Sequence, residues 1–245
     1  MKYLFANWKM YLDVPESIKM AKDVAALSYD KEQLSLAVFP TALAFTDVAK
    51  ELASTDIATG SQNVAWIPKG AYTGAVSAEM FQQAGATYAL VGHSERRHVF
   101  GETNEDVKKK FDACLAAGIT PILCIGETKE DLDAGKREYR LKKQLMSALD
   151  GVSKDAQFFV AYEPVWAIGT GDACDHLQAA EIHDLIKHEL NTYTTQPIPV
   201  LYGGSVNHEN VISYLPHRSI DGFLVGSAST KHDEMTSLLS AVLAA

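Results

Sequence analysis

The chain has 245 residues, of which 47% are hydrophobic and 22% are charged, the ordinary balance of a globular protein with a substantial core. Its formal net charge of -9 argues against nucleic acid or an anionic membrane as a partner, although helix starts can still bind a small anion through backbone N–H groups. The three cysteines form no C-x-x-C pair, and no apolar run suits a signal peptide or a membrane span, so we expect a cytoplasmic protein.

Eight short runs rich in β-branched and aromatic residues recur along the chain and predict strands. They cover residues 3–7, 34–39, 56–62, 87–92, 120–126, 158–163, 198–204 and 221–226. Several of these runs are apolar almost throughout, as expected of strands that are buried on both faces.

Helical patterns lie between the predicted strands. Residues 15–27 open with proline and an acid and carry apolar residues at i, i+3 and i+4, whereas residues 104–118 and 128–151 each end in glycine. Strand–helix alternation predicts parallel strands with right-handed crossovers. Eight such units in 245 residues predict an α/β fold, a closed (β/α)8 barrel of eight parallel strands in a single domain spanning 1–245.

A doubly wound open sheet is the competing architecture. Such a sheet usually shows a G-x-G-x-x-G turn after its first strand. Here the first strand runs into ANWKMYLD, which contains no glycine, so the sequence favours the barrel.

Candidate functional residues are those that follow the strands, because barrel active sites are built from these loops. The first strand leads to Asn7 and Lys9, the fourth to His93 and the sixth to Glu163. Glycine and serine gather after the last two strands, in YGGSV (202–206) and VGSAS (225–229). Taken singly, each residue also has a structural interpretation, as a solvated lysine, a capping group or a turn glycine. Their shared position at one rim favours function.

Other site motifs are absent from the sequence. HELNT from His188 and HENVI from His208 both lack the second histidine of a zinc-protease helix, and no G-x-x-x-x-G-K-[ST] loop occurs. The charged runs at 102–110 and 128–143 read as solvated helix faces.

With these motifs assembled, the sequence resembles the triosephosphate isomerase family over essentially its whole length. The resemblance is carried by seven motifs in the family's order: FANWKM (5–10), GAYTG (70–74), VGHSERR (91–97), CIGE (124–127), AYEPVWAIGTG (161–171), YGGSV (202–206) and GFLVGSAS (222–229). It implies interconversion of dihydroxyacetone phosphate and D-glyceraldehyde 3-phosphate through an enediolate, in glycolysis and gluconeogenesis, by a homodimer without metal or cofactor.

The resemblance also implies roles for individual residues. Glu163 would be the base and His93 the electrophile, while Asn7 and Lys9 would contact the substrate. The phosphate is expected among the remaining binding groups: the Gly169 N–H, Ser205, and the backbone of Gly226 and Ser227.

Physical chemistry supports these roles. An enediolate needs a base on one side and hydrogen-bond donors at its oxygens. Desolvation is expected to raise the pKa of Glu163, and the helix start at SERR is expected to keep His93 neutral, a pairing that is the established pattern of this family.

The resemblance further implies a mobile lid at about 164–174 and a dimer-contact loop at about 63–77. In the lid, Pro164 would stiffen the near hinge and Val165 and Trp166 would anchor it. The far end departs from the family, with Asp-Ala-Cys at 172–174 in place of Lys-Thr-Ala. Cys174 is interpreted as a small apolar substitute rather than a nucleophile.

Two further departures lie outside the lid. Ser227 replaces a second glycine, and its hydroxyl could add a donor to the phosphate site. Ala75 replaces a glutamate that supports the subunit contact near Arg96, so one rim charge pair is missing, at a cost of about 1 kcal/mol or less.

Two alternative functions stay open on the sequence. One is a catalytically silent phosphate-binding barrel, which could lose Glu163 or His93. The other is an isomerase or imine-forming aldolase acting on another small sugar phosphate, for which Lys9 is the candidate lysine.

Overall fold

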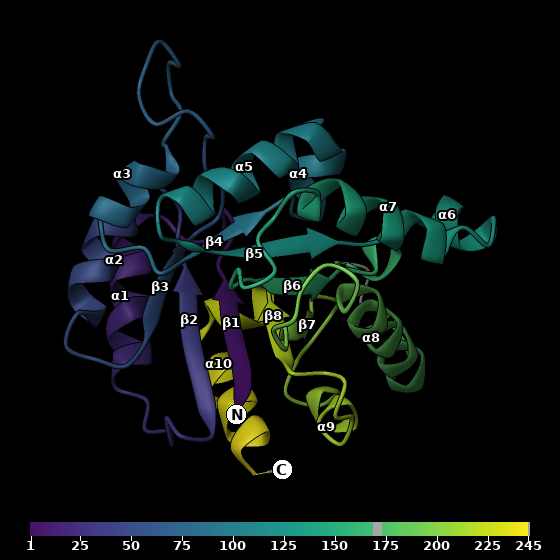
Figure 1. Ribbon diagram of the computed structural model, residues 1–245. Coiled ribbons are helices and arrows are strands. Elements are labelled where there is room, and N and C mark those ends of the chain that lie inside the picture. Colours follow the sequence, from purple (N-terminus) through teal and green to yellow (C-terminus); the bar gives the residue numbers. More distant parts are fainter. Residues whose placement is uncertain (169–172, 245) are drawn as a thin grey trace.

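The computed structural model describes residues 1–168 and 173–244, and within them eight parallel strands close into a barrel (Figure 1). Each strand pairs with the next along the chain, and β8 pairs with β1 to close the ring. The strands are β1 (Lys2–Asn7), β2 (Leu34–Phe39), β3 (Ala58–Ser61), β4 (Tyr88–Val91), β5 (Thr120–Ile125), β6 (Phe159–Tyr162), β7 (Val200–Tyr202) and β8 (Gly222–Val225). The predicted (β/α)8 barrel is therefore confirmed.

Helices surround the strands, and the connection between β3 and α3 projects from the body of the barrel (Figure 1). The α-helices are α1 (Val14–Ala25), α2 (Phe45–Leu52), α3 (Ala78–Gln83), α4 (Ser94–His98), α5 (Asn104–Ala116), α6 (Lys129–Asp133), α7 (Arg137–Leu149), α8 (His176–Leu190), α9 (Val211–Tyr214) and α10 (His232–Leu243). Two short 3-10 helices, η1 (Val165–Ala167) and η2 (Ser227–Thr230), follow β6 and β8. Within the described ranges, no helix is both long enough and apolar enough to span a bilayer.

Local sequence explains where the longer helices begin. The Asp13 side chain accepts a hydrogen bond from the Glu16 N–H, and the Glu16 carboxylate accepts one from the Asp13 N–H. Thr103 and Asp106 form the same reciprocal arrangement at the start of α5. Such boxes satisfy N–H groups that a helix start leaves without partners.

One predicted helix is wrong in extent. The pattern at 128–151 predicts a continuous helix, but α6 and α7 are separate helices with Gly135 between them, at φ 66°. This left-handed conformation suits glycine and ends α6. The charged residues on both sides hide the break, because they are equally compatible with one long solvated helix.

The barrel interior is a second apolar core, distinct from the one between strands and helices. Aromatic rings occupy its N-terminal end, with centroids 4.9 Å apart for Tyr3 and Phe159, 5.4 Å for Phe5 and Phe159, and 5.0 Å for Phe5 and Tyr88. Because this end is filled with side chains, the polar groups of the barrel are left to the opposite, C-terminal end of the strands.

Candidate active site

A cavity of about 330 Å³ lies at the C-terminal end of the strands and brings most of the candidate residues together. Its lining includes Asn7, Lys9, His93, Glu163, Ser205, Gly226 and Ser227. Gly169 lies outside the described residues. Asn7 is the last residue of β1, and the other groups come from the loops after β1, β4, β6, β7 and β8, so the barrel topology makes them neighbours.

Glu163 follows the last residue of β6, and only 2% of it is exposed. Its Oε1 lies 2.9 Å from Nε2 of His93, and its Oε2 accepts a hydrogen bond of 2.8 Å from the Ser94 N–H. Gly126 lets the end of β5 approach closely, because a Cβ there would lie 1.8 Å from the Glu163 carbonyl oxygen. The carboxylate is therefore held at a specific place on the cavity wall.

His93 is the N-cap of α4, as the SERR motif predicts. Its Nδ1 accepts a hydrogen bond of 3.3 Å from the Glu95 N–H, which leaves Nε2 as the nitrogen that carries a proton toward Glu163. The ring is 6% exposed, so both of its nitrogens have defined neighbours.

The contact between these side chains governs their protonation. Burial raises the pKa of Glu163, but the charge and hydrogen bond of His93 and the Ser94 N–H outweigh burial, so the pKa lies below its ordinary value. Burial lowers the pKa of His93, as does the Lys9 charge, but the charge and hydrogen bond of Glu163 outweigh them and raise the pKa. The pKa directions predicted from the sequence are thus wrong for this arrangement, because the sequence does not show that the two side chains touch.

Lys9 has φ 50°, an unusual left-handed conformation for a lysine. Its N–H donates to Oδ1 of Asn7 at 3.1 Å, and its carbonyl accepts from Nε2 of Gln62 at 2.7 Å. Its Nζ lies 2.6 Å from Oε1 of Glu95. Asn7 and Gln62 therefore hold the backbone from which the ammonium group projects into the cavity.

Sequence reasoning missed Gln62 and Glu95. The sequence position of each could have identified it, because Gln62 directly follows β3 and Glu95 lies in the first helical turn after His93. Read in isolation, each is an ordinary surface polar residue, and only the spatial contact with Lys9 distinguishes it.

Serine and glycine form the opposite wall of the cavity. The Ser205 hydroxyl donates to the Ala167 carbonyl at 2.7 Å, and Ser227 is the first residue of η2. A Cβ on Gly226 would lie 3.3 Å from Cε of Lys9, so glycine keeps this wall close to the lysine without a clash. This wall offers hydroxyl and backbone groups beside one ammonium, a suitable surface for a small anion.

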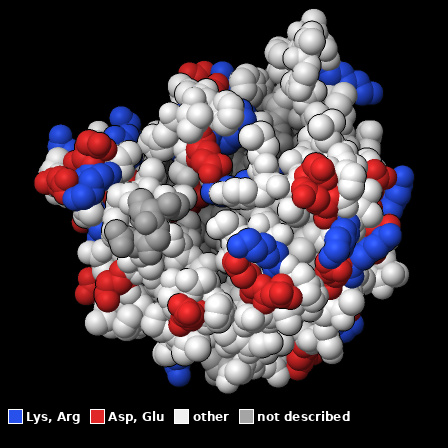
Figure 2. Space-filling model, turned by 180° about the vertical axis from the view of Figure 1, so that it is seen from behind, with Lys and Arg blue, Asp and Glu red and all other residues white. Residues whose placement is uncertain are grey.

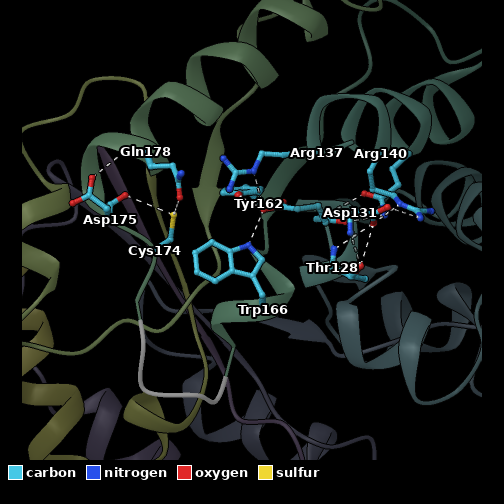
Figure 3. A network of polar contacts seen from close by, with 12 residues as sticks. Thr128, Asp131, Arg137, Arg140, Tyr162, Trp166, Cys174, Asp175 and Gln178 are labelled. Atoms are coloured by element: carbon cyan, nitrogen blue, oxygen red, sulfur yellow. Dashed lines mark hydrogen bonds and ion pairs between the residues drawn. The ribbon is translucent and has the colours of Figure 1, made fainter. Parts of the chain in front are cut away.

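Glu127 is a second buried carboxylate, two residues after β5, and it belongs to a different network. Figure 3 shows three members of this network, Arg137, Tyr162 and Trp166. Its Oε1 accepts hydrogen bonds from Nε of Arg137 at 3.0 Å, the Tyr162 hydroxyl at 3.0 Å and the Trp166 indole N–H at 2.9 Å. The Val165 N–H donates to the Glu127 carbonyl at 3.1 Å. The beginning of the segment after Glu163 is therefore tied to the end of β5.

Cys174 lies just before α8, where the chain leaves that segment, and it is buried. Its Sγ lies 3.3 Å from Oε1 of Gln178 (Figure 3), and burial raises the pKa of its thiol to about 11. A thiol with this pKa stays protonated at neutral pH, which agrees with the interpretation of Cys174 as an apolar substitute.

A larger cavity of about 630 Å³ adjoins the first and shares Asn7, Lys9 and His93 with it. Exposed apolar side chains line this second cavity, including Met10 (93% exposed), Leu43 (84%), Phe100 (65%) and Tyr72 (54%). Arg96 and Ala75 also line it. The Arg96 guanidinium lies 4.5 Å from the Phe100 ring centroid and pairs with Glu102 of the same chain at 2.6 Å.

Comparison with known proteins agrees with this geometry. A family model described as triosephosphate isomerase matches residues 2–242. The triosephosphate isomerase of Roseiflexus sp. strain RS-1 is 42% identical over 236 residues, covering 94% of this chain and 93% of that protein. Those of Dictyoglomus thermophilum and Aquifex aeolicus are each 39% identical, over 94% and 93% of this chain and 95% and 94% of the relatives.

Proposed function

Because this chain belongs to the triosephosphate isomerase family, whose reaction in glycolysis interconverts dihydroxyacetone phosphate and D-glyceraldehyde 3-phosphate, we propose which of its residues perform each step. The observation that carries the proposal is the 2.9 Å contact between Glu163 and His93 on the cavity wall. A base and a hydrogen-bond donor that meet at one point can act on adjacent atoms of a three-carbon substrate.

Glu163 is the base in this proposal. It removes a proton from the carbon next to the substrate carbonyl and returns a proton to the neighbouring carbon. A bound substrate would separate Glu163 from His93 and remove the contact that lowers the pKa of the carboxyl group, while the burial that raises this pKa would remain. The substrate itself would thereby strengthen the base.

His93 donates through Nε2 to the substrate oxygens, on which negative charge develops as the enediolate forms. Lys9 supplies a positive charge beside the same oxygens after exchanging Glu95 for the substrate, and Asn7 holds the Lys9 backbone as well as contacting the substrate. The phosphate lies against Ser205 and the backbone of Gly226 and Ser227, joined by the predicted Gly169 N–H.

The lid at about 164–174 also remains a proposal. Its support comes from its two described ends, since the Trp166 indole donates to Glu127 and the Cys174 N–H donates to the Tyr202 hydroxyl at the end of β7. A cover over the cavity would exclude water while the enediolate exists and so limit loss of its phosphate.

Incubation with dihydroxyacetone phosphate in D2O, followed by proton NMR, tests the proposed chemistry. We expect deuterium exchange at carbon together with formation of the aldehyde product. A silent phosphate-binding barrel would give neither signal. An imine-forming enzyme that uses Lys9 would be trapped by borohydride, a result that would overturn the single-base mechanism.

We propose that a second copy of this chain covers the 630 Å³ cavity. The support is the apolar lining of this cavity, which includes Tyr72 and other residues of the 63–77 loop. This loop projects from the body of the barrel (Figure 1). Exposed apolar patches of this kind mark contact sites between proteins. In sedimentation velocity, the dimer of the Tyr72→Asp variant should dissociate at concentrations where the parent chain stays dimeric, because the substitution places a charge in the apolar contact. Met146→Asp, at a comparably exposed position on α7, is the control. A monomeric parent chain would refute the proposal.

We also propose a cytoplasmic protein with no nucleic-acid partner. Its three cysteines are free and buried, and acidic and basic side chains are mixed on the face shown in Figure 2 rather than forming a basic surface. Cell fractionation and a gel-shift assay test the two statements, and recovery in an exported fraction or retardation of duplex DNA would contradict them.

A further inference from the structure

A glutamine on α7 pairs with the backbone at the end of β5. Oε1 of Gln144 accepts a hydrogen bond of 2.8 Å from the Gly126 N–H, and its Nε2 donates one of 3.1 Å to the Gly126 carbonyl. Gly126 directly follows the last residue of β5. The side-chain amide therefore offers Gly126 one acceptor and one donor, as an adjacent strand does for a residue inside the sheet.

This pairing lies inside the protein, on a helix face that is otherwise apolar. Gln144 is 5% exposed, and the other buried residues of α7 are Leu141, Leu145, Ala148 and Leu149. Burying an amide among apolar side chains is costly unless its polar atoms are paired. An apolar residue at this position would avoid that cost, so the glutamine indicates a requirement of the Gly126 backbone and not of the core.

Gly126 in turn contacts the backbone of Glu163. A Cβ at residue 126 would lie 1.8 Å from the Glu163 carbonyl oxygen, so only glycine allows this approach. The residues on both sides of Gly126 continue the pairing of the two strands. The Glu163 N–H donates to the Ile125 carbonyl at 2.8 Å, and the Val165 N–H donates to the Glu127 carbonyl at 3.1 Å. A movement of Gly126 would therefore be transmitted to Glu163.

The place of this backbone decides where the Glu163 carboxylate lies relative to His93, whose Nε2 is 2.9 Å from Oε1. A misplacement of a catalytic group by about 1 Å can lower the rate by about 100-fold. Among the described residues, Gln144 is not part of the lining of the 330 Å³ cavity. Its influence on the reaction must therefore pass through Gly126.

We propose that Gln144 is a positioning residue for the base of the isomerase reaction. Its amide holds Gly126 against Glu163 and so sets the place of the carboxylate on the cavity wall, without contact with the substrate. This inference rests on the role of Glu163 proposed above. Loss of the amide would displace the base and leave the groups after β7 and β8, which bind the phosphate in our proposal, in place.

Gln144→Met tests this inference, because methionine has a similar length and offers Gly126 neither the donor nor the strong acceptor of the amide. We expect kcat to fall about ten-fold, because a misplaced base removes the proton more slowly. The inhibition constant for inorganic phosphate should change less than about two-fold, because phosphate binding does not involve the base. Steady-state kinetics with and without phosphate measures both values.

Leu145→Ala is the matched control. Leu145 is fully buried on the same face of α7 and next to Gln144 in the chain, so its truncation leaves a cavity and lowers the melting temperature. Its kcat should stay close to that of the parent at a temperature where all the variants are folded. A Gln144→Met variant with the kcat of the parent would overturn the inference, and so would an equal loss of turnover in Leu145→Ala.

If Gln144→Met does not fold, Gln144→Asn replaces it in the same comparison. Asparagine keeps the amide but is one methylene too short to keep both bonds to Gly126, so its kcat should also fall, and an unchanged kcat would again overturn the inference. A parent chain that neither isomerises nor exchanges deuterium would instead refute the proposed function, so the two failures are distinguishable.

Discussion

Glu127 and Glu163 are buried carboxylates at the ends of neighbouring strands, and their surroundings are opposite in kind. Glu127 is fully buried and bonded through one oxygen to Arg137, Tyr162 and Trp166. Glu163 is almost as buried, but its carboxylate lies on the wall of the 330 Å³ cavity beside His93. Burial and charge are shared by both residues, so neither property identifies the base.

What separates the two residues is whether a small molecule can replace their partners. The partners of Glu127 are a guanidinium, a phenol and an indole that are themselves packed in protein, away from the cavity lining. His93 lines the cavity together with Glu163, and its Nε2–H is a donor that a substrate oxygen can also accept. A buried acid is a candidate base when its contact can be exchanged, and a structural ion pair when it cannot.

The largest expected effect is on turnover. Glu163→Gln should lower kcat by about 10²–10⁴-fold, the usual contribution of a positioned general base, because the amide cannot accept the proton. Glu127→Gln should lower kcat far less. Steady-state kinetics on both variants checks this contrast, and equal losses of turnover would abolish the distinction between the two carboxylates.

The second expected effect is on stability, and here the Glu127 variant should be affected more than the Glu163 variant. Glu127→Gln leaves the Arg137 charge without its carboxylate, and breaking such a pair costs about 3 kcal/mol or more in free energy of unfolding. Glu163→Gln should lower the free energy of unfolding less than Glu127→Gln does, because glutamine keeps an acceptor for the Ser94 N–H and the partner that loses its carboxylate is an imidazole, which can be neutral, rather than a guanidinium. Urea titrations measure both values, and a Glu127→Gln midpoint equal to that of the parent would contradict the structural role.

The smallest expected effect concerns a third buried ionisable residue. His183 is fully buried, and burial lowers its pKa to about 3, from 6.5. Contacts with the backbone of Ser219 and Val200 raise this pKa, but burial outweighs them. Between these two pH values the unfolded chain binds a proton that the folded chain does not, so stability falls as the pH drops below 6.5.

The slope of that loss is about 1.4 kcal/mol per pH unit, so between pH 7 and pH 5 the parent should lose about 2 kcal/mol more than His183→Gln. Denaturant titrations at the two pH values provide the comparison. Equal losses in the two proteins would show that His183 is not the group responsible for the loss of stability.

The sequence predicted the barrel well because each unit repeats one pattern, an apolar run followed by a helix. It also predicted that most of the candidate residues lie together, since the ends of parallel strands share one rim. It did not predict the break at Gly135, where solvated residues on both sides fit either one helix or two. Nor did it predict the Glu163–His93 contact, which joins residues far apart in the chain and reverses the expected pKa directions.

The sequence also could not distinguish residues whose role exists only in space. Gln62 and Glu95 are distinguished from other surface polar residues only by their contacts with Lys9. The phosphate contact predicted for Gly169 lies outside the described residues and stays a prediction.

The Glu95 N–H donates a hydrogen bond to Nδ1 of His93, which leaves Nε2 as the ring nitrogen that can interact with a substrate. In the proposed mechanism, a proton that Nε2 gives to one substrate oxygen would return to the same nitrogen from the neighbouring oxygen. The transfer between the two oxygens would then stay in the space between the ring and the substrate, away from exchange with bulk water.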